Sequence, residues 1–554
     1  MASFPSRGFR RGLVATTLLI IPAGLACSLI LGTDATQCSS DRDCARFGAY
    51  VCDTRQNLCV PQASSEGGAP DASRAECWDP AGFGGHGCYK CAPTTGEELL
   101  NACAKHAFVH FDNPARITGF DPANPIPPLP PAEAGPPVEA GSQPDAGGPD
   151  ASPGDASPGD AAPDGPPPVP RCPPLTTLKN PIVLVASTGF LLQPTLDALA
   201  TTTLGEVSIV WKVVGSCDGA SAMIPGGPAA SGEVTLLRPQ KEPFQCALDT
   251  AFPADIGGGG LFWETCNPDV PQPPDIQDVL GAVNPVSFIA PVASKESGIS
   301  AEAAYRVYGF GNRSGVMPWS DEDLIFRRNA RSGNQTAVAL ALGLPADRFV
   351  GIDSNGGSNM AKLVEQGAKI NADATIGISS SEVVDKSREV VKMLAYQHMN
   401  QRVGFFWDSD PAAFDRRAVR DGHYFFWVAI HVFARVSSSQ IVGGNPSLDA
   451  VRPRTLLGDM VNYLTIRRPL PGVNIFKELK DPRGGAAAIP QCAMRVTRKK
   501  DSGMLEPFTP PRSCGCAFES APPGTAPPEC KKCEQSGECP KDRPVCSFEY
   551  CEPN

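Results

Sequence analysis

Twenty-one cysteines constrain this chain of 554 residues more than any other feature. A cytosolic protein with so many thiols would need metal clusters, whereas an exported protein uses them as disulfides. We therefore predict a disulfide framework and an oxidising compartment, either the periplasm or the cell surface. Zinc is the alternative at the two CxxC pairs, Cys88–Cys91 and Cys530–Cys533, although few histidines lie near them.

The N-terminus predicts export. Three arginines precede an apolar stretch, residues 12–26, that is too short to span a bilayer comfortably. The stretch ends in AGLAC, which resembles the lipobox of bacterial lipoproteins and implies lipidation of Cys27. The resemblance implies a cell-envelope protein, lipid-anchored to a membrane and facing the periplasm or the cell surface. A simple secretory signal cut near Ala26 is the alternative.

Composition divides the chain into five predicted regions. Residues 1–26 form the signal peptide and residues 27–120 the lipid anchor with a cysteine-rich region. Residues 121–171 form a linker whose first fifty residues hold 17 prolines, eight acidic residues and no Lys or Arg. This stretch has too few apolar residues for their burial to offset the conformational entropy lost on folding. We therefore expect a disordered spacer. Residues 172–492 form a globular domain, and residues 493–554 form a second cysteine-rich region.

Net charge gives no support for nucleic-acid binding. Residues 121–170 carry eight of the eleven net negative charges, so the remaining regions are close to neutral.

Two short segments form a degenerate internal repeat of four cysteines, residues 38–60 and residues 533–551. Each unit lacks the apolar residues that a core requires. Two disulfides per unit would supply the missing stability by restricting the unfolded chain.

Apolar strands alternate with amphipathic helices in the globular region. This alternation predicts an α/β fold with largely parallel sheets, built as one large domain or as two lobes around a cleft. The expected strands are residues 181–187, 205–215, 232–238, 374–379, 402–409 and 423–436. The expected helices are residues 193–200, 358–368, 387–396 and 454–466.

Four polar segments follow a strand or open a helix: residues 186–190, 215–221, 273–280 and 327–345. Turns rich in Gly, Ser and Thr leave main-chain N–H groups free at helix N-termini, where anions bind. In an open α/β sheet, such turns gather at the carboxyl ends of the strands. The pattern predicts an anion site, and ordinary solvated loops beside ordinary helices are the alternative.

The segments STGF, VVGSCDGA, DIQD and RNARSGNQT resemble, in order and spacing, the ligand loops of type II periplasmic solute-binding proteins, specifically the phosphate-binding proteins of ABC transporters. The resemblance covers roughly residues 178–470 and implies a two-lobed type II fold flanked by small disulfide-rich units. It implies phosphate or another oxyanion held between the lobes and an ABC transporter permease as partner. The ligand-binding residues that it implies are Thr188, Phe190, Ser216, Asp278, Arg328, Ser332 and Gly333.

Within this resemblance Asp278 would accept a hydrogen bond from a protonated oxyanion, and Arg328 would be the charge partner of the ligand. Two residues depart from the family pattern, because Ala330 replaces an Asp and Asn334 replaces a Thr. Cys217 follows Ser216 directly, and we expect it to pair with Cys246 or Cys266 and stiffen that loop.

Catalysis receives little support. No nucleophile elbow, metalloprotease motif or nucleotide-binding loop follows a strand. The core histidines are interpreted as structural or surface residues, and the charged residues 408–417 as ordinary loop and helix-start charges. We therefore predict a protein that is not an enzyme and that uses no metal or cofactor. The alternative function is a cell-surface interaction protein whose cysteine-rich modules bind a partner, with a degenerate binding-protein core.

Overall fold

The computed structural model describes the backbone of residues 50–53 and 58–61, and residues 76–129, 169–187, 192–330, 332–468, 470, 472–481, 486–521 and 527–553. The chain divides into two compact units, Met1–Glu76 and Cys77–Asn554. Cys27, Thr188 and Phe190 lie outside the described residues. No helix in the described ranges has the length and apolar character needed to cross a membrane.

Both four-cysteine units contain the same hairpin. In the first unit, β1 (Tyr50–Asp53) pairs with β2 (Leu58–Pro61), and Cys52 lies opposite Cys59. Near the C-terminus, β23 (Val545–Ser547) pairs with β24 (Tyr550–Glu552), and Cys546 lies opposite Cys551. The third and fourth cysteines therefore occupy equivalent positions, as the internal repeat predicts.

The sixteen cysteines from Cys77 to Cys551 are all joined, as eight disulfides. The CxxC pairs are split between different partners, because Cys88 bonds Cys103 and Cys530 bonds Cys516. Disulfides therefore take the place of zinc at these pairs. The remaining bonds are Cys77–Cys91, Cys172–Cys246, Cys217–Cys266, Cys492–Cys514, Cys533–Cys546 and Cys539–Cys551.

A twelve-stranded sheet forms the core of the second unit, in the order β14-β13-β15-β11-β19-β10-β6-β7-β8-β9, with β16 and β20 as additional partners. We call the strands on one side of β11 and β19 the first lobe and those on the other side the second lobe. The first lobe contains β6 (Pro181–Ala186), β7 (Ser208–Val213), β8 (Ala230–Leu237), β9 (Phe244–Phe252) and β10 (Ile256–Gly259). The second lobe contains β13 (Ile325–Arg327), β14 (Ile352–Asp353) and β15 (Ile376–Ser380).

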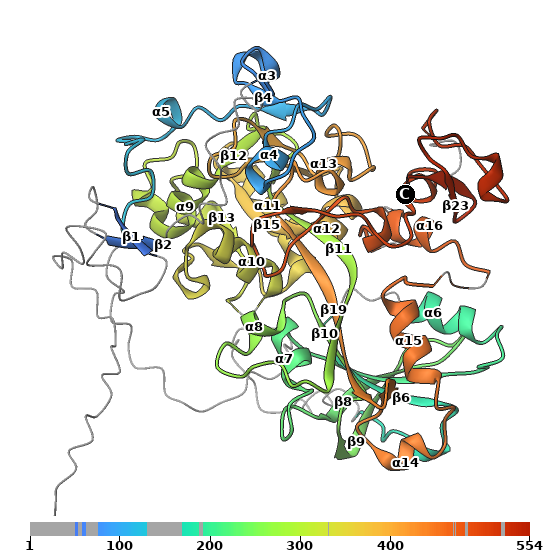
Figure 1. The fold of residues 1–554 in the computed structure, drawn as a ribbon. Coiled ribbons are helices and arrows are strands. Elements are labelled where there is room, and N and C mark those ends of the chain that lie inside the picture. Colours follow the sequence, from blue (N-terminus) through green and yellow to red (C-terminus); the bar gives the residue numbers. More distant parts are fainter. Residues whose placement is uncertain are drawn as a thin grey trace, which may run out of the picture. The chain divides into compact units, whose positions relative to one another are not determined.

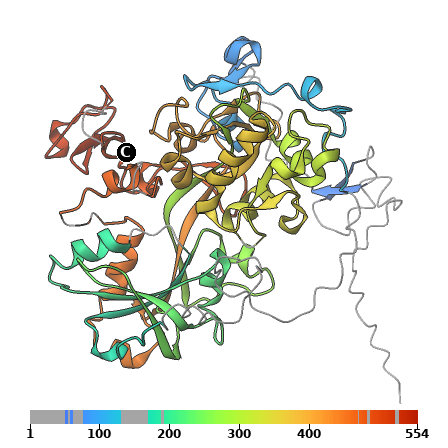
Figure 2. The same ribbon diagram turned by 180° about the vertical axis from the view of Figure 1, so that it is seen from behind.

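Two long strands connect the lobes. β11 (Ile276–Pro291) and β19 (Trp427–Ser437) pair in antiparallel fashion (Figures 1 and 2). β19 also pairs with β10 of the first lobe, and the last residues of β11 pair with β15 of the second lobe. The lobes thus share one central strand pair.

Helices pack beside the strands of each lobe. In the first lobe these are α6 (Leu192–Leu199), α7 (Ser216–Ser221), α8 (Trp263–Cys266), α14 (Pro446–Asp449) and α15 (Leu456–Leu464). In the second lobe they are α9 (Ala301–Phe310), α10 (Gly333–Leu342), α11 (Gly357–Asn371) and α12 (Ser381–Lys386).

Burial on both faces explains the continuous apolar run of β6. Ile182 and Leu184 belong to one hydrophobic cluster, whereas Val183 and Val185 belong to a second cluster on the opposite face. A strand covered on both sides has no polar face, so it shows no alternation in sequence. The predicted α/β class with disulfide-rich flanking units is confirmed.

The sheet is mixed, and the expectation of largely parallel strands was wrong. β6 is parallel to β7 and β10, and β13 is parallel to β14 and β15. β8, β9, β11 and β19 instead run antiparallel to their neighbours. Antiparallel pairs need no helical crossover, so the alternation of strands and helices breaks down around them.

Residues 387–396, expected as a helix, form a turn followed by two short strands. β16 (Val391–Met393) pairs with the end of β11, and β17 (Ala395–Gln397) pairs with β12 (Gly298–Ser300). The edge of β11 offers unpaired backbone groups, and the β-branched Val391 lies opposite Pro291 there. Tertiary pairing therefore overrides a weak helical periodicity.

The N-terminal cysteine-rich segment joins the fold directly. β5 (Phe108–Val109) pairs with β18 (Gly404–Phe405) in a four-stranded sheet that also contains β12 and β17. The strand expected over residues 402–409 is thus reduced to the two residues of β18.

Candidate functional site

The two lobes meet at Ser216 and Gly333, which begin helices α7 and α10. A Cβ atom added to Gly333 would lie 2.5 Å from the Ser216 Oγ and 3.2 Å from its Cβ. Gly260 lies near the same hydroxyl, because a Cβ atom added to it would lie 3.7 Å from the Ser216 Oγ. The structure therefore brings together two of the predicted ligand residues that are far apart in the sequence.

A run of glycines allows α7 to approach the sheet this closely. Cβ atoms on Gly257 and Gly259 of β10 would lie 2.2 Å from the Gly219 carbonyl oxygen and 2.0 Å from that of Ser216. No side chain fits in that space, so the helix backbone rests directly on the strand backbone. The glycine run, residues 257–260, was not singled out in the sequence, although four consecutive glycines were a visible signal of close backbone approach.

A disulfide holds the start of α7 in place. Cys217 bonds Cys266 at the end of α8, which settles the choice between the two expected partners. Cys246 bonds Cys172 instead. Ser216 thus precedes a residue that is covalently tied to a neighbouring helix, which limits the movement of its loop.

Asp278 lies on strand β11 rather than in a loop, and its carboxylate is engaged by a histidine. The two carboxylate oxygens lie 3.0 and 2.8 Å from Nδ1 of His431 on β19. His431 is fully buried, lies opposite Gly259 in the sheet and contacts the edge of the Phe262 ring. Asp278 therefore belongs to the same neighbourhood as Ser216, with His431 between them.

These three residues do not form a catalytic triad. The buried Nε2 of His431 has no hydrogen-bond partner among the residues that the structure describes, so the Ser216 hydroxyl is not bonded to it. A serine nucleophile requires a base within hydrogen-bonding distance of its hydroxyl.

Arg328 lies beside the start of α11. A Cβ atom on Gly357, the first residue of that helix, would lie 3.1 Å from the Arg328 Nη1. Burial lowers the pKa of Arg328, and the carboxylate of Asp353 opposes this shift. Its buried Nε has no hydrogen-bond partner within the described ranges. No contact between Arg328 and Ser216 is found among the described residues.

Ser332 immediately precedes α10 and leaves its first turn open. The Ser332 side chain makes no capping hydrogen bond, whereas its carbonyl oxygen accepts bonds from the main chain and the hydroxyl of Thr336. The first N–H groups of a helix have no partner within the helix. The start of α10 therefore offers donors that the Ser332 side chain does not occupy.

A segment beyond the predicted globular domain reaches this region. The Asp501 carboxylate accepts a hydrogen bond from the Phe262 main chain in the first lobe, at 2.8 Å. The Ser502 hydroxyl donates to the Ala337 carbonyl oxygen in the second lobe, at 2.7 Å. These adjacent residues bridge the lobes, and no local sequence signal indicated this.

A buried ion cluster corrects the interpretation of residues 408–417 as ordinary loop charges. Asp408 is fully buried and both of its oxygens lie 2.7 Å from Nη1 of Arg416, which also bonds Asp385. Arg388 bonds Asp385 at 2.7 Å and Asp408 at 2.9 Å. Burial raises the pKa of Asp408, although both arginines oppose the shift. The cluster joins segments from α12 and the following loops.

Comparison with known proteins gives structural likeness only. No family model matches the chain, and no curated protein matches it. A putative phosphate ABC transporter substrate-binding protein with bound phosphate from Clostridium perfringens is 14% identical, with a TM-score of 0.32, over 53% of this chain and 99% of that one. An ABC-type phosphate transport receptor from Vibrio cholerae is 16% identical, with a TM-score of 0.29, over 46% and 88%.

The OxyR regulatory domain from Pseudomonas aeruginosa, in its reduced form, is also similar in structure. It is 10% identical, with a TM-score of 0.27, over 52% of this chain and 98% of that one. Transport proteins and regulatory domains are thus similar to this chain to the same low degree. This similarity supports no conclusion about what the chain binds.

Proposed function

We propose that this protein is an extracytoplasmic solute-binding protein that takes phosphate or a related oxyanion between its lobes. The observation that carries the proposal is the meeting of Ser216 with Gly333. A hydroxyl from one lobe faces the uncapped N-terminus of a ten-residue helix from the other. Oxyanions bind to such N–H groups, where the helix dipole favours negative charge.

Arg328 supplies the positive charge in this proposal. It follows β13 directly, in the same loop that leads to Gly333, and it is partly buried with a free Nε. A guanidinium presents several donors in a rigid plane, which suits oxyanions. Thr188 and Phe190 would complete the ligand loops, as the family resemblance implies.

The strand pair β11 and β19 would act as the hinge between the lobes. Both lobes pair with these strands, so rotation about them would open and close the space at Ser216. Lipid on Cys27 would hold the protein at a membrane. Both ends of the predicted linker belong to the folded domain, because the Pro127 carbonyl oxygen accepts a hydrogen bond from the Tyr305 hydroxyl and that of Pro170 accepts one from the Ala247 main chain, each at 2.8 Å. An ABC transporter permease would then receive the ligand from the closed form.

Calorimetry on the full chain tests this proposal. Phosphate and sulfate are titrated into the wild type, Ser216→Ala and the matched surface control Ser447→Ala. We expect an oxyanion to bind the wild type and the control, and Ser216→Ala to weaken binding about tenfold, since a hydrogen bond to a charged group is lost. The absence of heat and of any thermal shift with both anions would contradict the proposal.

One observation favours the alternative of a surface interaction protein. Asp501 and Ser502 bridge the lobes by hydrogen bonds, which suits a rigid display domain better than a moving one. In that case Ser216→Ala and Arg328→Ala would leave the cellular phenotype unchanged, whereas deleting residues 533–551 would abolish it.

A further inference from the structure

A pocket lies away from Ser216, between residues 93–106 and the C-terminal region. It has a volume of about 700 Å³. Its lining includes Leu99, the helix α13 (Arg417–Arg420), Met494, Phe508, α17 (Gly515–Glu519) and residues of the C-terminal hairpin. These elements are distant in sequence and lie largely outside the part that resembles binding proteins.

The arginines of this pocket are not equally neutralised. Arg417 bonds the Glu519 carboxylate at 2.5 Å, and Arg495 bonds Asp421 at 2.9 Å. Arg543 has only the sulfur of Cys516 as a hydrogen-bond partner, at 3.2 Å, and no carboxylate partner within the described ranges. Arg543 therefore lines the pocket without an ion pair among the described residues, although Glu529 and Glu552 line the same pocket.

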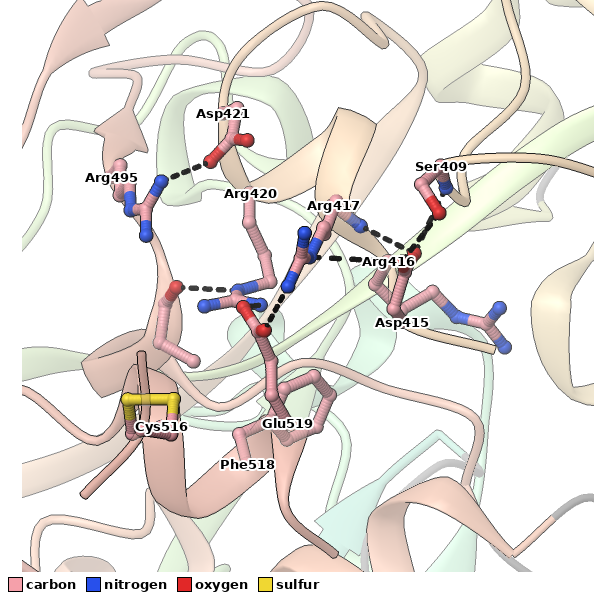
Figure 3. A network of polar contacts seen from close by, with 12 residues as sticks. Ser409, Asp415, Arg416, Arg417, Arg420, Asp421, Arg495, Cys516, Phe518 and Glu519 are labelled. Carbon is pink, nitrogen blue, oxygen red and sulfur yellow. Dashed lines mark hydrogen bonds and ion pairs between the residues drawn. A yellow bond between two sulfur atoms is a disulfide. The ribbon is translucent and has the colours of Figure 1, made fainter. Parts of the chain in front are cut away.

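Arg420 presents a free donor in the pocket wall. Its side chain is about 1% exposed, its Nε donates to the Ala493 carbonyl oxygen, and its Nη1 bonds Glu519. Its buried Nη2 has no partner among the residues described by the structure. Figure 3 shows Arg417 and Arg420 together at the Glu519 carboxylate, with the Cys516 disulfide close by. A buried guanidinium donor without a partner is costly unless a ligand or water completes it.

Gly515 lies directly beside this donor, where there is no room for a larger side chain. A Cβ atom there would lie 3.0 Å from the Arg420 Nη2 and 3.5 Å from the Glu552 Oε2. Glu552 is itself held in place, because it accepts bonds from the Cys516 main chain at 2.6 Å and from the Ser513 hydroxyl at 3.1 Å. The Arg420 donor is therefore bordered by fixed groups.

We propose that this pocket binds a small organic acid through its carboxylate, with Arg420 and Arg543 as the recognising side chains. Four carboxylates, Asp421, Glu519, Glu529 and Glu552, already line the site, so a doubly charged phosphate would be repelled more strongly than a single carboxylate. The apolar side chains of Leu99, Met494 and Phe508 would contact the carbon body of such a ligand. The cavity is also far larger than an inorganic ion requires.

Calorimetry on the full chain with benzoate, succinate and inorganic phosphate tests the proposal. We expect benzoate or succinate to bind the wild type. Gly515→Ala, which fills the space beside Nη2, and Arg543→Gln, which removes the second cation, are each expected to weaken that binding about tenfold. Neither change breaks an ion pair, and unfolding curves check that both variants remain folded.

Two control variants make the outcome decisive. Gly458→Ala adds a methyl group in open space on α15, and Ser216→Ala alters only the interlobe site; both are expected to bind the carboxylate as the wild type does. Failure of both carboxylates to bind, or binding that neither pocket variant affects, overturns the proposal. Phosphate binding that Arg543→Gln abolishes and Ser216→Ala preserves would overturn the assignment to carboxylates.

Discussion

The Ser216 hydroxyl oxygen lies 2.5 Å from the point that a Cβ atom on Gly333 would occupy. These residues begin helices in different lobes, so this contact places the two helix starts together. Glycine is required there because any other side chain would displace the hydroxyl or the helix.

Substituting Gly333 tests this contact. We expect Gly333→Ala to lower the free energy of unfolding by about 1–2 kcal/mol through overpacking. In a Ser216→Ala background the loss should be smaller by at least about 0.5 kcal/mol, since the closest atom is gone. Urea unfolding of the four proteins in the cycle measures both values. Gly458→Ala, in open space within a helix, should instead be neutral or slightly stabilising; equal losses in both backgrounds would disprove the contact.

Removing the Cys217–Cys266 disulfide should destabilise the first lobe. The double variant Cys217→Ala with Cys266→Ala opens a loop with a sequence separation of 49. We expect a loss of about 2–5 kcal/mol, because the unfolded chain regains the entropy of that loop. Thermal unfolding of the oxidised proteins provides the measurement. The same variant should also weaken oxyanion binding, and unchanged stability would show that the bond is not formed.

The pair of Asp278 and His431 should contribute to stability independently of any ligand. Asp278→Asn weakens a charged acceptor for a buried histidine, and we expect a loss of about 2 kcal/mol in urea unfolding. Asp323→Asn, at an exposed position, is the matched control and should change stability by less than about 0.5 kcal/mol. Similar values for both variants would mean that the pair makes no net contribution.

Two histidines with lowered pKa values, His398 and His423, predict a loss of stability in weak acid. Burial lowers the pKa of His398 to about 3 and that of His423 to about 4. Below the unfolded value of about 6.5, the unfolded chain takes up protons at these positions while the folded protein does not. Stability should therefore fall as the pH drops from about 6.5 towards 4, with each histidine adding up to about 1.4 kcal/mol per pH unit.

Urea unfolding at pH 7, 6 and 5 measures this slope. His398→Gln should be less stable than the wild type at pH 7, because it loses the stacking on Phe425 and the contact with the Tyr396 hydroxyl. Its stability should nevertheless fall less steeply with acid, since one titrating group is gone. Parallel slopes for the two proteins would contradict the assignment.

Much of the fold could be predicted from local pattern. The apolar run at residues 181–187 and the amphipathic helix at residues 454–466 both appear as β6 and α15. The pattern of apolar residues within each segment is enough to predict the element, so no distant partner has to be known. Residues 391–397 were misassigned because their hydrogen-bond partners, in β11 and β12, are remote in sequence.

The candidate site was predictable only in part. The turns that hold Ser216 and Gly333 were recognised from their residue types, the two residues themselves were implied by the family resemblance, and the structure brings them into contact. The engagement of Asp278 by His431 and the bridge formed by Asp501 and Ser502 were not predicted. Each of these contacts joins segments that no periodicity relates.

The sequence by itself determined the alternation of strands and helices, the disulfide chemistry of the cysteines and the turns that could receive an anion. These properties follow from residue types within a few positions of one another. Only the tertiary structure decided which turns meet, which charges are buried together and where the free donor of Arg420 lies. Such contacts depend on strand pairing between remote segments and on close approach of backbones, as at the glycines of β10. A local sequence pattern cannot predict them.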